Sequence, residues 1–187
     1  MRLFTAIDLP THIRDHLARI PETLRTHPTL KDLSWTKSDN LHITLKFLGD
    51  IPDEHLPNLC RALAQLPVPT LSLTLNPFLV LPGRGPARIL AANVRGDLEP
   101  LAHLFSHVES AVQPLGVRRE ARAYKPHVTL ARIKRPTRKL TAQALGRVVD
   151  PSLLPTPAFT ATDFTLYQSQ LDPKGSIYIP LARIGAP

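Results

Sequence analysis

The sequence predicts an α+β fold that combines antiparallel strands with a few helices. The chain has 187 residues, which is enough for one domain with a substantial core or for two small lobes that share one. Segments with helical spacing and segments with strand alternation are interspersed, and several strands form hairpin-like pairs. No boundary between independent domains is evident. We therefore expect residues 1–187 to form a single two-lobed domain.

Four segments have the apolar spacing of helices. The first begins at Pro10, since proline is favoured at the first helical position. Its apolar residues recur at helical spacing, at Ile13, Leu17, Ile20 and Leu24. Another helix opens after Asp97. The predicted helices cover about residues 10–25, 53–66, 97–113 and 137–147.

Strand patterns occupy the segments between the helices. The clearest alternation is Leu71, Leu73 and Leu75, and Gly49-Asp50 marks the end of an earlier strand. Prolines fall between the periodic segments and indicate stiff loops. The predicted strands cover about residues 2–8, 33–36, 41–48, 71–80, 88–94, 123–133, 159–168 and 176–184.

A His-x-Thr pattern occurs twice, each time inside a predicted strand and each time followed by Leu. The copies are His42-Ile43-Thr44 and His127-Val128-Thr129. Because side chains alternate across a strand, the histidine and threonine of each copy share one face. One copy alone would mean little, since a single strand histidine is usually a hydrogen-bonded structural residue. Two copies in similar contexts predict two imidazoles and two hydroxyls in one site, where one imidazole acts as base and the other as acid.

The charge of the chain favours a polyanionic partner. It carries 23 Lys and Arg against 15 Asp and Glu, a formal charge of +8, and such a field attracts nucleic acid. Much of the excess lies around the second motif, and solubility is the competing explanation. The basic residues of this cluster are Arg118, Arg119, Arg122, Lys125, Arg132, Lys134, Arg135, Arg138 and Lys139.

Other features predict a cytoplasmic protein. The single cysteine, Cys60, cannot form an internal disulfide. The apolar start of the chain is too short for a signal peptide and is interrupted by Asp8, and no later run approaches the length of a membrane span. We therefore expect no membrane association, and we expect a monomer.

Four segments, in this order and spacing, resemble the two-histidine phosphoesterase superfamily, and within it the RNA 2′,3′-cyclic phosphodiesterases also described as 2′-5′ RNA ligases. The segments are RLFTAIDLP, LHITLKFLGD, YKPHVTLARI and FTLYQSQL, the last followed by Gly175, Tyr178 and Pro180-Leu181. The resemblance covers nearly the whole chain. It implies two antiparallel sheets flanked by helices around a central groove with pseudo-two-fold symmetry, an RNA substrate ending in a 2′,3′-cyclic phosphate, and neither metal nor nucleotide cofactor.

The resemblance also implies roles for particular residues. His42 and His127 resemble the catalytic pair, which we assign as acid and base respectively. Thr44 and Thr129 resemble the hydroxyls that hold phosphate oxygens. The remaining candidates are Arg132 for the phosphate, and Phe47, Tyr124, Lys125, Arg118 and Arg119 for the nucleotide or RNA; Trp35 is expected in the core.

Strand parity creates a difficulty for two of these candidates. Phe47 and Arg132 each lie five residues after a motif histidine, so strict alternation places them on the opposite face. They reach the site only if the strand ends, twists or bulges there.

Three rival interpretations stay open. A non-catalytic RNA-binding module would need the basic surface but not both imidazoles. A metal hydrolase would need further ligands, yet only Asp39 and Asp50 flank the first motif, at loop positions. A related two-histidine enzyme that acts on small cyclic nucleotides or on 2′-5′ oligonucleotides differs only in its substrate.

Overall fold

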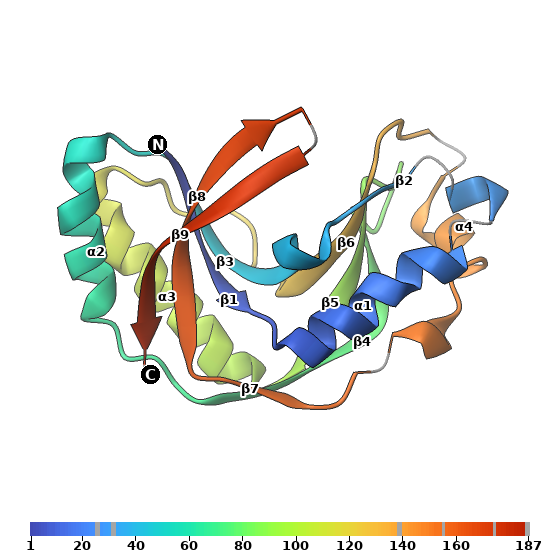
Figure 1. Cartoon of the computed structure of the whole chain (residues 1–187), viewed down its shortest axis with the longest axis horizontal. Helices are drawn as coiled ribbons and strands as arrows, with labels where there is room; N and C mark the ends of the chain where they lie inside the picture. The colour runs from blue at the N-terminus through green and yellow to red at the C-terminus, as the bar shows by residue number, and fades with distance from the viewer. Residues whose placement is uncertain (25–26, 31–32, 138–139, 155, 174, 186–187) are drawn as a thin grey trace.

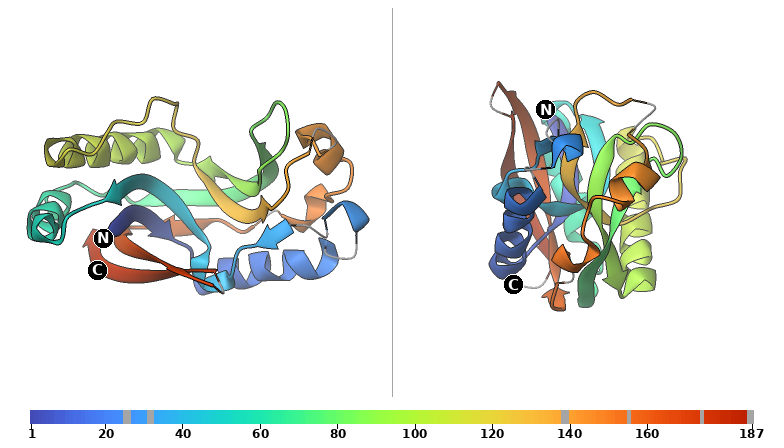
Figure 2. Two further views of the ribbon diagram at one scale, coloured as in Figure 1. Left: turned by 90° about the horizontal axis from the view of Figure 1, so that it is seen from above. Right: turned by 90° about the vertical axis from the view of Figure 1, so that its right-hand side faces the viewer.

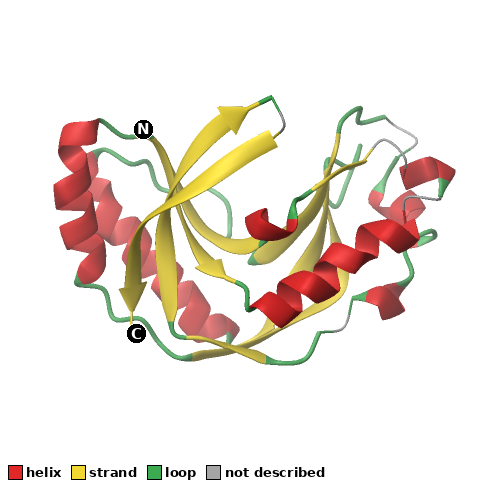
Figure 3. Ribbon diagram, viewed as in Figure 1, coloured by secondary structure: helices red, strands yellow, loops and turns green. Residues whose placement is uncertain are grey.

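The computed structural model describes residues 1–24, 27–30, 33–137, 140–154, 156–173 and 175–185 (Figure 1). In these residues the strands are β1 (Arg2–Asp8), β2 (Leu33–Trp35), β3 (His42–Asp50), β4 (Leu71–Leu81), β5 (Ile89–Gly96), β6 (His127–Ile133), β7 (Phe159–Ala161), β8 (Asp163–Asp172) and β9 (Gly175–Gly185). The α-helices are α1 (Thr11–Leu24), α2 (Leu56–Ala64), α3 (Leu98–Val112) and α4 (Ala142–Gly146). The predicted α+β class is confirmed (Figure 3).

The described strands form one nine-stranded sheet in the order β7-β4-β5-β6-β3-β1-β8-β9, with β2 also paired to β6. All pairs are antiparallel, and β3 meets β6 through a single residue pair, Ile43 with Val128. We call β3-β1-β8-β9 the first half-sheet and β6-β5-β4-β7, with β2, the second half-sheet. The sequence predicted two antiparallel sheets, whereas the described strands form a single sheet, because the pair of Ile43 with Val128 joins the two halves.

The helices are divided between the two half-sheets. Helices α2 and α3 lie at the first half-sheet, whereas α1 lies along the second (Figure 2). Each helix buries a stripe of leucine, isoleucine or valine at helical spacing, and burial of this apolar surface stabilises the packing. The buried residues are Ile13, Leu17, Ile20 and Leu24 in α1, Leu59 and Leu63 in α2, and Leu101, Leu104, Val108 and Val112 in α3.

Three predicted elements differ most from the structure. The strand predicted over 123–133 begins only at His127, after Pro126, which has no N–H to donate to a ladder. The strand predicted over 159–168 is two strands, because β7 pairs with β4 in the second half-sheet while β8 pairs with β1 in the first. The helix predicted over 137–147 is confined to α4, which Thr141 caps by accepting the Ala144 N–H; residues 138–139 lie outside the described residues.

Candidate active site

The two His-x-Thr motifs lie side by side at the junction of the half-sheets. Their middle residues, Ile43 and Val128, form the antiparallel pair between β3 and β6. In this register the histidine of each motif lies opposite the threonine of the other, and opposite residues project from the same face. Ile43 and Val128 are fully buried on the other face. The sheet therefore brings together four half-buried side chains, those of His42, Thr44, His127 and Thr129.

A β-bulge follows each motif and resolves the parity difficulty. The pairing of β1 with β3 skips Leu45, and the pairing of β5 with β6 skips Leu130. One extra residue reverses the facing of every residue after it. Phe47 and Arg132 therefore return to the face of the histidines, where both are exposed, Phe47 to 64%.

Backbone carbonyls orient both imidazoles in the same way. His42 Nδ1 lies 2.8 Å from the carbonyl oxygen of Asn40, and His127 Nδ1 lies 2.7 Å from that of Lys125. A carbonyl oxygen only accepts, so Nδ1 donates in each case and Nε2 is free for chemistry. The Nε2 atom of His42 lies 3.0 Å from the Thr44 hydroxyl, which holds the ring in place.

Aromatic rings surround His42 on its other sides. Its ring centre lies 5.1 Å from that of Phe4 and 5.4 Å from that of Tyr178, the latter edge-on. Phe4 in turn lies 6.0 Å from Phe47 and stacks on Tyr167 at 5.3 Å. The sequence analysis did not assign this cluster, because its members come from four strands that are distant in the chain.

The surroundings of His42 disfavour its charged form. The pKa of His42 is lowered from 6.5 to about 4, chiefly by burial; the positive charges of Arg132 and of protonated His127 act in the same direction, and the Asn40 carbonyl and the Asp8 carboxylate oppose the shift. His42 is therefore neutral near pH 7 in the free protein. The influence of Arg132 on His42 also places this arginine within electrostatic reach of the site.

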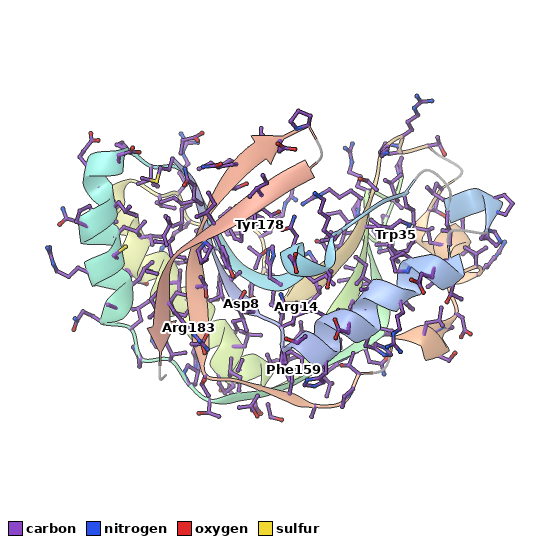
Figure 4. All side chains as sticks on the ribbon, viewed as in Figure 1. Asp8, Arg14, Trp35, Phe159, Tyr178 and Arg183 are labelled. Atoms are coloured by element: carbon purple, nitrogen blue, oxygen red, sulfur yellow. The ribbon has the colours of Figure 1, made fainter. Side chains whose placement is uncertain are left out.

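Asp8 is a site residue that the sequence analysis missed. It pairs with His42 across β1 and β3, and Figure 4 shows it with Arg14 and Tyr178 in the middle of the molecule. Its carboxylate accepts hydrogen bonds from the Tyr167 hydroxyl at 2.6 Å and the Thr165 hydroxyl at 2.8 Å. In the sequence, the sign of this role is a carboxylate at the end of the β1 segment, on the same strand face as Phe4 and Ala6.

The backbone of the segment before the second motif is held by hydrogen bonds to Lys46 and Glu109. Lys46 Nζ donates to Glu109 Oε1 at 2.5 Å and to the Arg118 carbonyl at 2.8 Å, and Glu109 also accepts the Glu120 N–H at 2.7 Å. This ion pair is nearly buried, with 5% and 12% of the two side chains exposed. It fixes the backbone that carries the exposed side chains of Arg118 and Arg119.

Tyr124 has packing contacts that link this segment to the first motif. Its hydroxyl donates to the Thr44 carbonyl at 3.0 Å, and its ring stacks on Phe105 at 4.3 Å. Burial raises the pKa of the Tyr124 hydroxyl. Lys125 is exposed, and its carbonyl holds His127. The RNA-binding roles predicted for Tyr124, Lys125 and the two arginines stay predictions.

The other candidates from the sequence lie away from the histidines. Trp35 pairs with Ala131 on the opposite face and packs against the hydrophobic core, as predicted (Figure 4).

In the part of the chain that the structure describes, no three His, Cys, Asp or Glu side chains cluster in a way that could hold a metal ion. The described helices include none with the length and apolar character needed to cross a membrane.

Comparison with known proteins places the chain among phosphoesterases. A family model described as LigT like Phosphoesterase matches residues 7–91 and 96–178. The chain is 30% identical to an RNA 2′,3′-cyclic phosphodiesterase of Archaeoglobus fulgidus, over 95% of this chain and 96% of that protein. It is 31% identical to one of Thermus thermophilus, over 98% and 89%. The crystal structure of Escherichia coli LigT complexed with 3′-AMP superposes with a TM-score of 0.78 at 27% identity, covering 98% of this chain and 97% of that one.

Proposed function

Since the chain belongs to the LigT-like phosphoesterase family, we propose that it hydrolyses RNA 2′,3′-cyclic phosphate ends to 2′-phosphomonoesters. The observation that carries the proposal is the pair of imidazoles on one face, each held by a carbonyl at Nδ1, which leaves Nε2 as the nitrogen for proton transfer. The names of the relatives supply the substrate class. The whole chain acts as one two-lobed domain in this proposal, because each half-sheet contributes one motif.

The reaction requires two proton transfers on opposite sides of phosphorus. Water loses a proton as its oxygen attacks, and the departing 3′ oxygen of the ribose gains one. A neutral imidazole at His127 serves as base and an imidazolium at His42 as acid, and each role contributes roughly 10²–10⁴-fold. Binding of the anionic phosphate favours the imidazolium, because an opposite charge nearby stabilises the charged form.

The remaining groups on this face bind the substrate. The hydroxyls of Thr44 and Thr129, with the guanidinium of Arg132, stabilise the negative charge on the non-bridging oxygens. Phe47 presents an exposed ring on which a base can stack. If a 5′-hydroxyl RNA end replaces water, the reverse reaction joins strands through a 2′-5′ linkage without ATP.

The test is an RNA that ends in a 2′,3′-cyclic phosphate, incubated with saturating EDTA and no ATP. We expect wild-type turnover, and a loss of about 100-fold or more in His42→Ala and in His127→Ala, since each removes one proton transfer. His103→Ala is the matched control, because this histidine is exposed on α3. Full activity in either motif variant would disprove the site. Loss of turnover in EDTA that zinc restores would instead indicate a metal hydrolase.

A further inference from the structure

The two motif histidines have different neighbours at equivalent positions of the sheet. Asp8 on β1 pairs with His42 on β3, and Asn93 on β5 pairs with His127 on β6. Each neighbour projects from the same face as its histidine, because residues opposite each other in an antiparallel pair share a face. One histidine therefore has a carboxylate beside it and the other a neutral amide.

The next residue pair on this face is alike in the two half-sheets. Two residues along the strands, Ala6 pairs with Thr44 and Ala91 pairs with Thr129. Both alanines are fully buried, and in each half-sheet the bulge follows directly. The contrast between Asp8 and Asn93 is therefore a charge difference that the strand pairing builds directly beside the two histidines.

The carboxylate of Asp8 is held in place by two hydrogen bonds. One oxygen accepts the Tyr167 hydroxyl and the other accepts the Thr165 hydroxyl, and the Tyr167 ring is itself stacked on Phe4. The ion pairs recorded among the described residues do not include Asp8: Arg183 pairs with Asp163 at 2.6 Å, and Arg14 lies 3.9 Å from Asp39.

Among the charged groups that act on His42, Asp8 alone is negative. The other influences are burial, the Asn40 carbonyl, and the positive charges that His127, when protonated, and Arg132 bring from β6. The nearest aromatic neighbours are Phe4 and Tyr178. Asp8 is thus the charged group that, together with the Asn40 carbonyl, favours a proton on His42.

We infer that Asp8 is the positioning residue that makes His42 the proton donor, whereas Asn93 leaves His127 as the proton acceptor. The inference rests on the proposed function. In each turnover His42 Nε2 gives its proton to the 3′ oxygen as the bond from phosphorus to that oxygen breaks. His127 Nε2 takes a proton from water as the new P–O bond forms, and proton exchange with solvent restores both histidines.

Two substitutions of nearly equal size test the inference in opposite ways, Asp8→Asn and Asn93→Asp. Since His42 is mostly neutral at pH 7, its protonated fraction limits kcat/KM if it is the acid. Asp8→Asn removes the negative charge that favours a proton on His42, so it should lower kcat/KM about tenfold, and by the same factor at every pH from 6 to 8. Asn93→Asp should also lower kcat/KM, because a carboxylate favours the protonated, inactive form of His127.

The reversed assignment predicts a different pair of results. If His42 were the base, it would already be neutral at pH 7, so Asp8→Asn would leave kcat/KM nearly unchanged and Asn93→Asp would raise it. Either of these results would overturn the inference. Thr165→Val keeps the carboxylate and removes one of its hydrogen bonds, so it should cost less than Asp8→Asn; an equal loss would indicate a merely structural role.

A titration of the histidine Cε1 protons by NMR gives a second measurement that needs no substrate. Asp8→Asn should lower the titration midpoint of His42, and Asn93→Asp should raise that of His127. Unchanged midpoints in variants with native amide spectra would refute the coupling even in an active enzyme. If the wild type shows no turnover of the cyclic phosphate, the proposed function fails while the titration still decides whether Asp8 acts on His42.

Discussion

Replacing Lys46 with methionine tests the ion pair between Lys46 and Glu109, which holds the segment before the second motif. Lys46→Met keeps the apolar stem but removes the ammonium group, so it leaves the Glu109 carboxylate, only 12% exposed, with the Glu120 N–H as its remaining recorded partner. Breaking one member of a buried ion pair costs about 3–5 kcal/mol. Because Glu109 retains some contact with solvent, we expect about 3 kcal/mol, or a fall in Tm of about 6–12 °C for a chain of this length.

The double variant Lys46→Met/Glu109→Leu separates the unpaired charge from lost packing. It removes both charges, so we expect it to be more stable than Lys46→Met alone, by urea unfolding followed by circular dichroism. A single variant as stable as the wild type, or a double variant less stable than the single, would show that the ion pair does not stabilise the fold in this way.

The pH dependence of the same variant gives an independent check. Burial raises the pKa of Glu109, but the hydrogen bonds from Lys46 and the Glu120 N–H outweigh it and hold the pKa below its ordinary value of 4.5. The stabilisation by the ion pair is therefore fully present above pH 4.5 and is lost as the pH falls through the folded-state pKa. The stability difference between wild type and Lys46→Met should narrow in acid. A constant difference would contradict the ionic origin.

Three further sets of substitutions probe the residues proposed to bind the substrate. Reversing Arg118 and Arg119 to Glu should raise KM for an RNA oligonucleotide and leave KM for a cyclic mononucleotide unchanged. In the wild type, KM should be lower for the oligonucleotide than for the mononucleotide, and this difference should shrink as the salt concentration rises. Equal KM values for both substrates at all salt concentrations would indicate a small-molecule phosphodiesterase. Phe47→Ala should weaken oligonucleotide binding by about 1–3 kcal/mol with little change in Tm, and unchanged binding would rule out base stacking. Thr44→Ala and Thr129→Ala should lower kcat less than the histidine variants, since water partly replaces a hydroxyl; a greater loss would require a direct role in proton transfer.

The sequence by itself determined the local geometry of the motifs and the faces of the helices. In each His-x-Thr segment the two polar side chains share a face because the strand repeats every two residues, whatever lies beside it. In α1 the apolar residues at helical spacing predicted the buried stripe that the structure shows. These features depend only on bonds and dihedral angles within one segment.

Which residues surround the motifs depends on contacts between segments that are far apart in the chain. The bulges at Leu45 and Leu130, which turn Phe47 and Arg132 onto the site face, exist because a neighbouring strand skips one residue. Asp8 lies beside His42 for a related reason, since β1 pairs with β3 in one register. Pairing between strands is set by the packing of the whole sheet, and a change of one residue in register turns every side chain to the other face. The motif residues of the site can therefore be recognised in the sequence, whereas the charged groups around them follow from contacts between segments that are distant in the chain.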